Sequence, residues 1–162
     1  TNNAGCIATS SPISIQFISL TKGWNLMSTN LIVSDSSIST IFNGLDVQEI
    51  KTMDAFWRKG QNNMFNSLQK ITSVNGYLVY MNSAATIAIA GEVTTFSKVS
   101  PLTSNGWQLM GCPFQTATPF STSFNATNCS KIKNFDGFWI PNGTTNSIQN
   151  FEPGKGYFIK VP

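Results

Sequence analysis

The sequence TKGWNLM at residues 21–27 returns as SNGWQLM at residues 104–110, and this recurrence decides the fold. A second pair of segments follows at matched spacing, DAFW at 54–57 and DGFW at 136–139. A third pair closes each copy, NGYLV at 75–79 and KGYFI at 155–159. All four tryptophans lie in these matched segments, which indicates that the chain holds two copies of one structural unit.

The extent of the match sets the expected domain boundaries. Residues 18–92 form the first module, residues 102–162 form the second, residues 93–101 link them, and residues 1–17 are an N-terminal extension. In this extension Ile13, Ile15 and Phe17 alternate with polar residues, which predicts a strand. A strand outside both copies can pair with the sheet edge of a neighbouring chain, so these three residues are our candidate assembly strand.

The expected fold class is mainly β. Four segments of the first module are rich in β-branched and aromatic residues and predict strands. Between them, apolar residues at helical spacing from Ile38 to Leu45 predict one short helix, capped by Asp35 or Ser36, and the second module carries a weaker helical pattern around Phe120. We therefore expect two tandem pseudo-repeats, each a small β-barrel or sandwich with one short helix. The predicted strands are 24–33, 47–57, 76–81 and 86–90.

The composition is typical of an exported protein with few charges. Hydrophobic residues make up 41% of the chain, enough for a core, while charged residues make up 10% against an average of about 25%. The net charge of +3 comes from scattered side chains without a basic stripe, so we expect no nucleic-acid partner. No apolar run approaches the ~20 residues that span a bilayer, so we expect no membrane span.

The order of these motifs resembles a known repeat domain. Gly-Trp-Asn-Leu at 23–26, a polar stretch with a short helix, a strand ending in Trp, and Pro-Gly-Lys-Gly-Tyr at 153–157 are similar to a repeat found in secreted and cell-surface proteins of bacteria and archaea. The first copy departs from the pattern, because residues 72–75 replace the Pro-Gly turn. The resemblance implies an exported, often cell-surface setting, and it transfers no active-site residues.

The sequence offers few candidate catalytic residues. Histidine is absent, which removes Ser-His-Asp and Cys-His catalysis and the commonest zinc ligand. Asp54 and Asp136 are the one pair of carboxylates that the repeat matches, and they fit a turn role, in which a carboxylate accepts backbone hydrogen bonds, better than a glycosidase pair. We expect a protein that is not an enzyme and that holds no metal or cofactor.

The three cysteines predict one disulfide. Cys112 and Cys129 would close a short loop in the second module, which would stabilise the fold by ~3 kcal/mol. Cys6 is then left over, whether free, buried or bonded to another chain. Sequons at Asn125, Asn128 and Asn142 are acceptors for glycosylation only in a suitable host.

The best candidates for a binding surface are Trp57 and Trp139, with Asn142 close by. Flat aromatic rings stack on the apolar faces of sugars, and amide side chains can bind the hydroxyls. The competing interpretation is that both rings anchor the core, since a buried Trp removes ~150–250 Å² from water. Because neighbouring residues of a strand face opposite sides, one ring of each Phe-Trp pair should point outward. We expect Trp24 and Trp107 in the core.

These observations favour an exported structural or adhesive protein, self-associating or bound to another surface protein, as in a surface layer or filament. The alternative function is a carbohydrate-binding module that uses exposed tryptophans, with glycans as partners. A glycoside-active enzyme would require Asp54 or Asp136 to face a second carboxylate.

Overall fold

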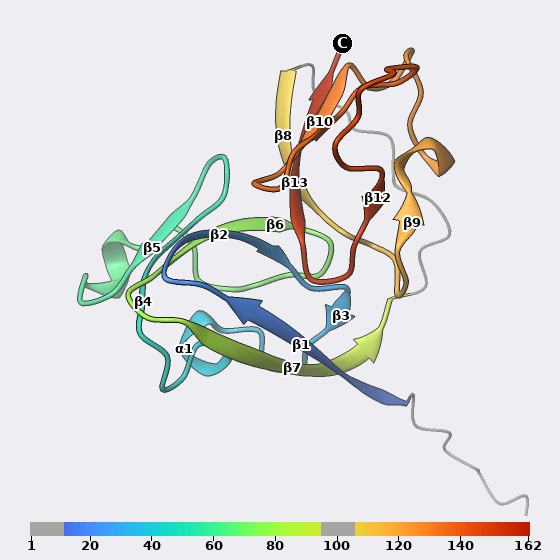
Figure 1. The fold of residues 1–162 in the computed structure, drawn as a ribbon. Helices are drawn as coiled ribbons and strands as arrows, with labels where there is room; N and C mark the ends of the chain where they lie inside the picture. The colour runs from blue at the N-terminus through green and yellow to red at the C-terminus, as the bar shows by residue number, and fades with distance from the viewer. Residues whose placement is uncertain (1–11, 95–105) are drawn as a thin grey trace, which may run out of the picture.

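The computed structural model describes residues 12–94 and 106–162, which form two β-rich modules packed together (Figure 1). The first module holds a three-stranded sheet with the order β1-β7-β3 and a four-stranded sheet with the order β2-β6-β4-β5. All pairings are antiparallel. Its elements are β1 (Ile13–Leu20), β2 (Gly23–Ser28), β3 (Leu31–Ile32), α1 (Ile38–Ile41), β4 (Val47–Lys51), β5 (Phe56–Arg58), the 3-10 helix η1 (Asn63–Phe65), β6 (Gly76–Met81) and β7 (Ala85–Val93).

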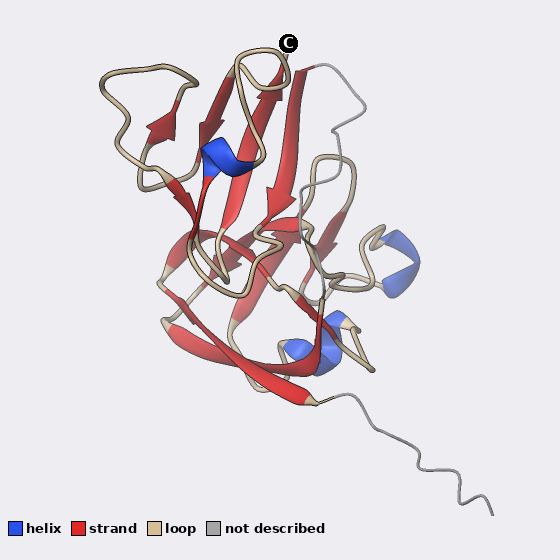
Figure 2. Cartoon of the chain, turned by 90° about the vertical axis from the view of Figure 1, so that its right-hand side faces the viewer, coloured by secondary structure: helices blue, strands red, loops and turns tan. Residues whose placement is uncertain are grey.

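The second module repeats the four-stranded sheet, with the order β11-β10-β13-β8, and adds a short pair formed by β12 and β9. Figure 2 shows that its strands stand beside the first module and that helical segments are short throughout the drawn elements. The elements are β8 (Gly106–Gly111), β9 (Thr118–Pro119), the 3-10 helix η2 (Phe120–Thr122), β10 (Lys131–Lys133), β11 (Phe138–Trp139), β12 (Asn150–Phe151) and β13 (Gly156–Val161).

The internal repeat predicted from the motifs is confirmed by the strand registers. Trp57 lies opposite Ile50 in the first module, as Trp139 lies opposite Ile132 in the second. Side-chain hydrogen bonds repeat as well. The Ser67 hydroxyl accepts from the Phe56 amide at 3.0 Å, and the matched Ser147 hydroxyl accepts from the Phe138 amide at 2.8 Å. Residues that match between the copies therefore build the same local structure twice.

The core of the first module lies between its two sheets. Ile18 and Ile87 from the β1-β7-β3 sheet meet Met27 and Val79 from the β2-β6-β4-β5 sheet in one buried cluster. Two sheets that share a core in this way form a sandwich. The core of the second module lies against one face of its four-stranded sheet and is rich in aromatic rings. Phe120, Phe151 and Tyr157 pack there with centroids 4.8 to 5.4 Å apart, mostly edge to face.

The predicted fold class, mainly β in two pseudo-repeats, is confirmed, and of the short helix expected in each module the first is an α-helix. The sheets of the described residues are open and do not close into barrels. Ile38–Ile41 is the predicted helix, and the Asp35 carboxylate supports its start by accepting from the Ser37 amide at 3.0 Å. The weaker helical pattern of the second module forms the single 3-10 turn at Phe120–Thr122. None of the helices in ranges 12–94 and 106–162 is long and apolar enough to cross a membrane.

Two predicted strands are divided in the structure. The segment 24–33 splits after Ser28, because Leu31–Ile32 joins the other sheet beside β7. The segment 47–57 is a hairpin, in which a turn at 52–55 reverses the chain and the Thr52 amide donates to the Ala55 carbonyl at 2.8 Å. The predictions over 76–81 and 86–90 are confirmed by β6 and β7.

Candidate functional site

The two tryptophans predicted as binding residues point toward the cores. Trp139 packs on Phe120 with ring centroids 5.6 Å apart, and 8% of its surface is exposed. The prediction that Trp139 forms a binding surface is wrong, because strand alternation turns the Trp of the Phe-Trp pair inward. Trp57 is half-buried against the first core and keeps an accessible side beside Phe42. Its outward neighbour Phe56 is the exposed ring of that pair.

Asn142, the third predicted binding residue, forms a turn. Its φ is 59°, in the left-handed region that Asn tolerates better than most residues. The Gly143 amide donates to the Ile140 carbonyl at 3.0 Å across this turn. The Asn142 side chain is exposed, and the residue lines neither of the two grooves described below.

Trp24 and Trp107, which we expected in the core, are the exposed tryptophans, at 41% and 37%. Trp24, Leu26 and Ser28 share the outer face of β2, since alternate residues of a strand point the same way. The second module covers Ser28 completely and Leu26 in part. Trp24 lies beyond this cover, so its indole borders open space at the edge of the module junction.

The junction itself is reciprocal. The Ser28 amide donates to the Gly154 carbonyl at 2.9 Å, and the Gly111 amide, at the matched position of the second module, donates to the Val74 carbonyl at 2.6 Å. Val74 and Gly154 are matched positions as well. Each module therefore contributes the same two elements to the contact, as in the isologous interface of a two-fold dimer.

The repeat glycines meet two different needs. Gly23 and Gly106 of the Gly-Trp motif both have a φ of 96°, which a side chain would strain. Gly76 and Gly156 of the Gly-Tyr motif lie against the opposite module. A Cβ at Gly76 would lie 2.8 Å from the Met110 carbonyl oxygen, and one at Gly156 would lie 2.9 Å from that of Met27.

The exposed tryptophans each line a groove at this junction. The Trp24 groove, of about 440 Å³, is bounded by the end of β1, the start of β2, and two turns of the second module at 134–136 and 153–155. The Trp107 groove, also about 440 Å³, is bounded by the start of β8, the turn at 52–54 and residues 75–76 of the first module. The repeat thus builds two related grooves, and each is lined by both modules.

The two grooves differ in their aromatic content and charge. Phe135 lines the Trp24 groove and is 60% exposed, whereas Met53 stands at the matched position of the Trp107 groove. Phe17, from the outward face of β1, is a further aromatic residue in the lining of the Trp24 groove. Asn75 of the Trp107 groove stands at the position matched by Lys155 in the Trp24 groove.

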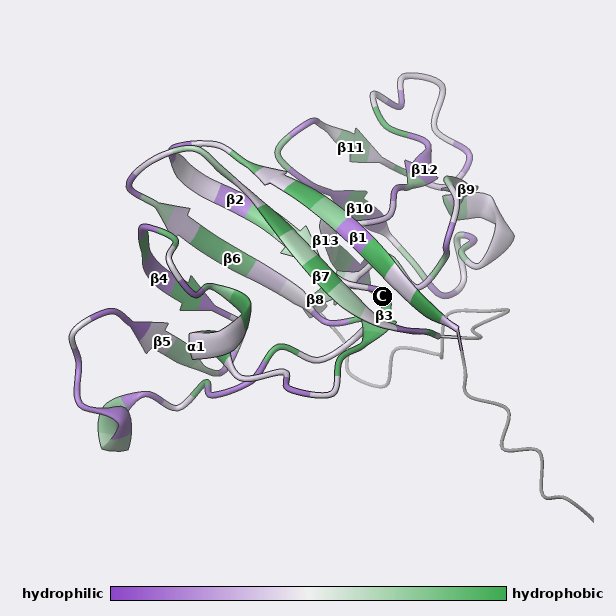
Figure 3. Cartoon of the chain, turned by 90° about the horizontal axis from the view of Figure 1, so that it is seen from below, coloured by the Kyte–Doolittle hydropathy of each residue, from purple (hydrophilic) through white to green (hydrophobic). Residues whose placement is uncertain are grey.

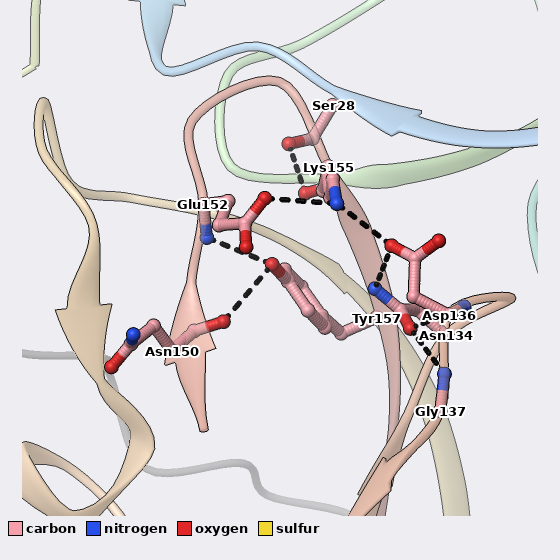
Figure 4. A network of polar contacts seen from close by, with 8 residues as sticks. All are labelled: Ser28, Asn134, Asp136, Gly137, Asn150, Glu152, Lys155 and Tyr157. Atoms are coloured by element: carbon pink, nitrogen blue, oxygen red, sulfur yellow. Dashed lines mark hydrogen bonds and ion pairs between the residues drawn. The ribbon is translucent and has the colours of Figure 1, made fainter. Parts of the chain in front are cut away.

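A polar network forms one edge of the Trp24 groove (Figure 4). The Lys155 ammonium lies 2.7 Å from the Asp136 carboxylate and 2.8 Å from that of Glu152. Burial opposes the charge of Lys155, but hydrogen bonds to Asp136 and Glu152 outweigh it and raise the Lys155 pKa. The Ser28 hydroxyl donates to the Lys155 carbonyl at 2.7 Å, so the network is joined to the module junction.

Tyr157 holds the turn that carries this network. Its buried hydroxyl accepts from the Glu152 amide at 2.8 Å and lies 3.3 Å from the Asn150 carbonyl oxygen (Figure 4). Burial raises the pKa of this phenol well above its usual value. Tyr77 repeats the arrangement, since its hydroxyl accepts from the Thr72 amide at 2.8 Å. Both tyrosines are therefore core residues with hydrogen-bonded hydroxyls.

Cys112 and Cys129 are two separate buried thiols, so the predicted disulfide is wrong. The Cys112 amide donates to the Lys155 carbonyl at one end of β13, whereas Ser130, next to Cys129, donates to the Lys160 carbonyl at the other. At ~3.3 Å per residue these ends are roughly 16 Å apart, beyond the ~7 Å that a disulfide can bridge between Cα atoms. Burial raises the pKa of each thiol to about 11. Cys6 lies outside the described residues.

The matched carboxylates Asp54 and Asp136 lie in turns that line different grooves. The Asp54 amide donates to the Thr52 hydroxyl at 3.3 Å, and the Asp136 amide donates to the Asn134 side chain at 2.8 Å. Asp136 faces Lys155, which stands between it and Glu152. Among residues 12–94 and 106–162, no three His, Cys, Asp or Glu side chains gather as metal ligands.

The predicted assembly strand is β1, and it pairs with its own chain. All eight residues from Ile13 to Leu20 lie opposite β7, so the strand crosses the boundary that the repeat suggested after residue 17. Its side chains still fit a contact role, because Ile13, Ile15 and Phe17 point away from the core and are 66%, 61% and 71% exposed. Seen from below, β1 and β7 lie on the face toward the viewer, with long hydrophobic stretches (Figure 3).

Comparison of the chain with protein-family models, with curated proteins and with solved structures found no match. The sequence placed Trp24 and Trp107 in the core and did not single out Phe135. The available signal was the alternation of β2 and β8, which places each tryptophan on the face opposite Met27 or Met110. Phe135, between Asn and Asp in a turn, was a second such signal.

Proposed function

We propose that this protein is a non-catalytic structural or adhesive protein of the cell exterior, whose copies associate through the outer face of the β1-β7-β3 sheet. The observation that carries the proposal is the apolar strip on that face. Ile15 lies opposite Ala90, Phe17 lies opposite Ala88, and all four side chains are exposed. Ile32 of β3 extends the strip on the far side of β7.

The strip matches the largest apolar patch of a typical single chain, about 300–600 Å². At ~150–250 Å² for a large side chain, Ile13, Ile15, Phe17 and Ile32 expose on the order of 400–600 Å² at their exposed fractions. Patches of this size on soluble proteins commonly mark interaction sites. The strip alone supplies at least about half of the ~800 Å² that each partner of a standard-size complex buries.

The partner that fits this face is a second copy of the same chain. Glu92 is the one charged residue among the outward positions of β1, β3 and β7, and it lies at one end of the strip beside Ile13. A two-fold axis perpendicular to the strip runs the two strips in opposite directions, which places each Glu92 far from its counterpart, so no like charges meet. The outer edge of β1 also carries no strand among the described residues, which leaves room for contact along it.

The exterior setting is supported by the low content of charged residues and by the repeat motif. Both are features of the sequence, and neither depends on the strip. The sheet face supplies the mechanism of assembly, in which apolar side chains leave water when two copies meet.

The experiment is sedimentation velocity over a range of concentrations, with two matched variants. Ile15→Asp places a charge in the strip, whereas Met64→Asp places one at an 88% exposed apolar residue of η1, away from the sheet. We expect wild type and Met64→Asp to associate as concentration rises and Ile15→Asp to stay monomeric with an unchanged circular dichroism spectrum. A wild-type chain that stays monomeric, or an Ile15→Asp variant that associates as wild type does, would refute the proposal.

A further inference from the structure

We infer that the Trp24 groove is a binding site for a neutral saccharide, and that the related Trp107 groove is not. The inference does not rest on self-association, because it concerns a different surface. Phe17 alone borders both.

Three aromatic residues from three parts of the chain line the Trp24 groove. Phe17 comes from β1, Trp24 from β2, and Phe135 from a turn of the second module. Large aromatic side chains are usually buried, and where several stay exposed together they commonly anchor a ligand. The groove volume of about 440 Å³ lies within the range of small-molecule sites.

The Trp24 ring is held in place before any ligand arrives. Tyr80 meets it edge to face with centroids 5.1 Å apart, and the Lys51 ammonium lies 5.3 Å from its centroid. Neither support lines the groove. A ring that is already ordered loses little conformational freedom on binding, which favours affinity.

The polar edge of the groove selects for hydroxyl groups. The half-exposed Asp136 carboxylate accepts hydrogen bonds and the half-exposed Lys155 ammonium donates them, and the two atoms lie 2.7 Å apart. A hydroxyl both donates and accepts, so it can bridge such a pair. Lys155 also pairs with Glu152, so the network carries one net negative charge, which disfavours an anionic ligand. A sugar ring, with one apolar face and a rim of hydroxyls, presents both features that this groove accommodates.

The Trp107 groove supplies an internal control. Trp107 is exposed to a similar degree and is likewise held by a lysine, whose ammonium lies 4.4 Å from the ring centroid. That groove carries Met53 and Asn75 where the Trp24 groove carries Phe135 and Lys155. It therefore lacks the second aromatic ring and the carboxylate–ammonium pair on which the inference depends.

The test is binding of the whole chain to a printed array of neutral oligosaccharides, followed by titration calorimetry with the strongest binder. Trp24→Ala and Phe135→Ala should each weaken binding by about tenfold or more, as truncation of an anchoring aromatic residue does. Trp107→Ala should bind as wild type does. Phe135 lies in an exposed turn, so its variant tests the groove even if Trp24→Ala is poorly folded.

Three results would overturn the inference: no wild-type binding on the array, equal losses in Trp24→Ala and Trp107→Ala, or binding that survives Phe135→Ala. Binding of proline-rich peptides in place of sugars, with the same dependence on Trp24, would also overturn the assigned ligand class. Ile15→Asp should retain sugar binding, so failure of the assembly proposal and failure of this one are distinguishable.

Discussion

Replacing Gly156 with alanine tests why glycine precedes tyrosine at the end of each module. Gly156 starts β13 where the backbone of β2 in the other module passes. The new Cβ would lie 2.9 Å from the Met27 carbonyl oxygen and 3.1 Å from the Leu26 side chain. The Leu26 side chain can turn aside, but the carbonyl belongs to a backbone that is tied across the junction at Ser28.

The expected cost follows from this overlap. The Cβ needs several tenths of an ångström more room than the junction leaves, so the two modules must separate slightly or the strands must shift. Forcing an extra methyl into a packed contact costs about 1–3 kcal/mol. For a protein of this length that corresponds to a fall in Tm of roughly 2–12 °C. Gly76→Ala should cost a similar amount, since its Cβ would lie 2.8 Å from the Met110 carbonyl oxygen.

Thermal unfolding of paired alanine and asparagine variants separates this steric cause from backbone strain. At Gly156 and Gly76, asparagine should destabilise more than alanine, because it is larger. At Gly23 and Gly106, a Cβ would have no other atom within 4 Å, but φ is 96°. Asparagine should therefore destabilise less than alanine at these two positions, because it tolerates positive φ better. A Gly156→Ala variant as stable as wild type, or the same asparagine preference at all four glycines, would refute the reasoning.

Two further predictions concern the core. Trp139→Ala should lower the free energy of unfolding by about 3–5 kcal/mol in urea titrations. Trp24→Ala should lower it by less than half as much, because Trp24 is exposed. Equal losses would contradict the burial of Trp139 and the exposure of Trp24. Stability should also fall as pH rises from about 9 to 11, since burial raises the pKa of the Cys112 and Cys129 thiols from 9.0 to about 11, and the folded chain keeps protons that the unfolded chain releases. Each thiol contributes on the order of 2–3 kcal/mol to the free energy of unfolding below pH 9, and this contribution is lost progressively above pH 9. Urea unfolding at pH 9 and pH 11 should show a smaller loss of stability in the double variant Cys112→Ala, Cys129→Ala than in wild type. An equal loss in the two proteins would contradict the prediction.

The sequence alone was sufficient for the repeat and the fold class. Matched motifs such as those at 54–57 and 136–139 form the same turn and strand in each copy. Their structure is set by local sequence, so it could be predicted without knowing how the other module packs. Alternation also placed Ile13, Ile15 and Phe17 on one face of a strand, since a period of two separates the faces of a strand; that this face is exposed is seen only in the structure.

Which face is covered was decided by tertiary structure. Alternation divides β2 into two faces but does not say which one another layer will bury, so Trp24 was assigned to the wrong side, and whether Trp139 or Phe138 faces the core was left open. The same limit explains the cysteines, because Cys112 and Cys129 are close in sequence but lie at opposite ends of β13. The grooves are the clearest case. Phe135 lines the same groove as Trp24 only because the two modules pack together, and local patterns carry no information about residues so far apart in the chain.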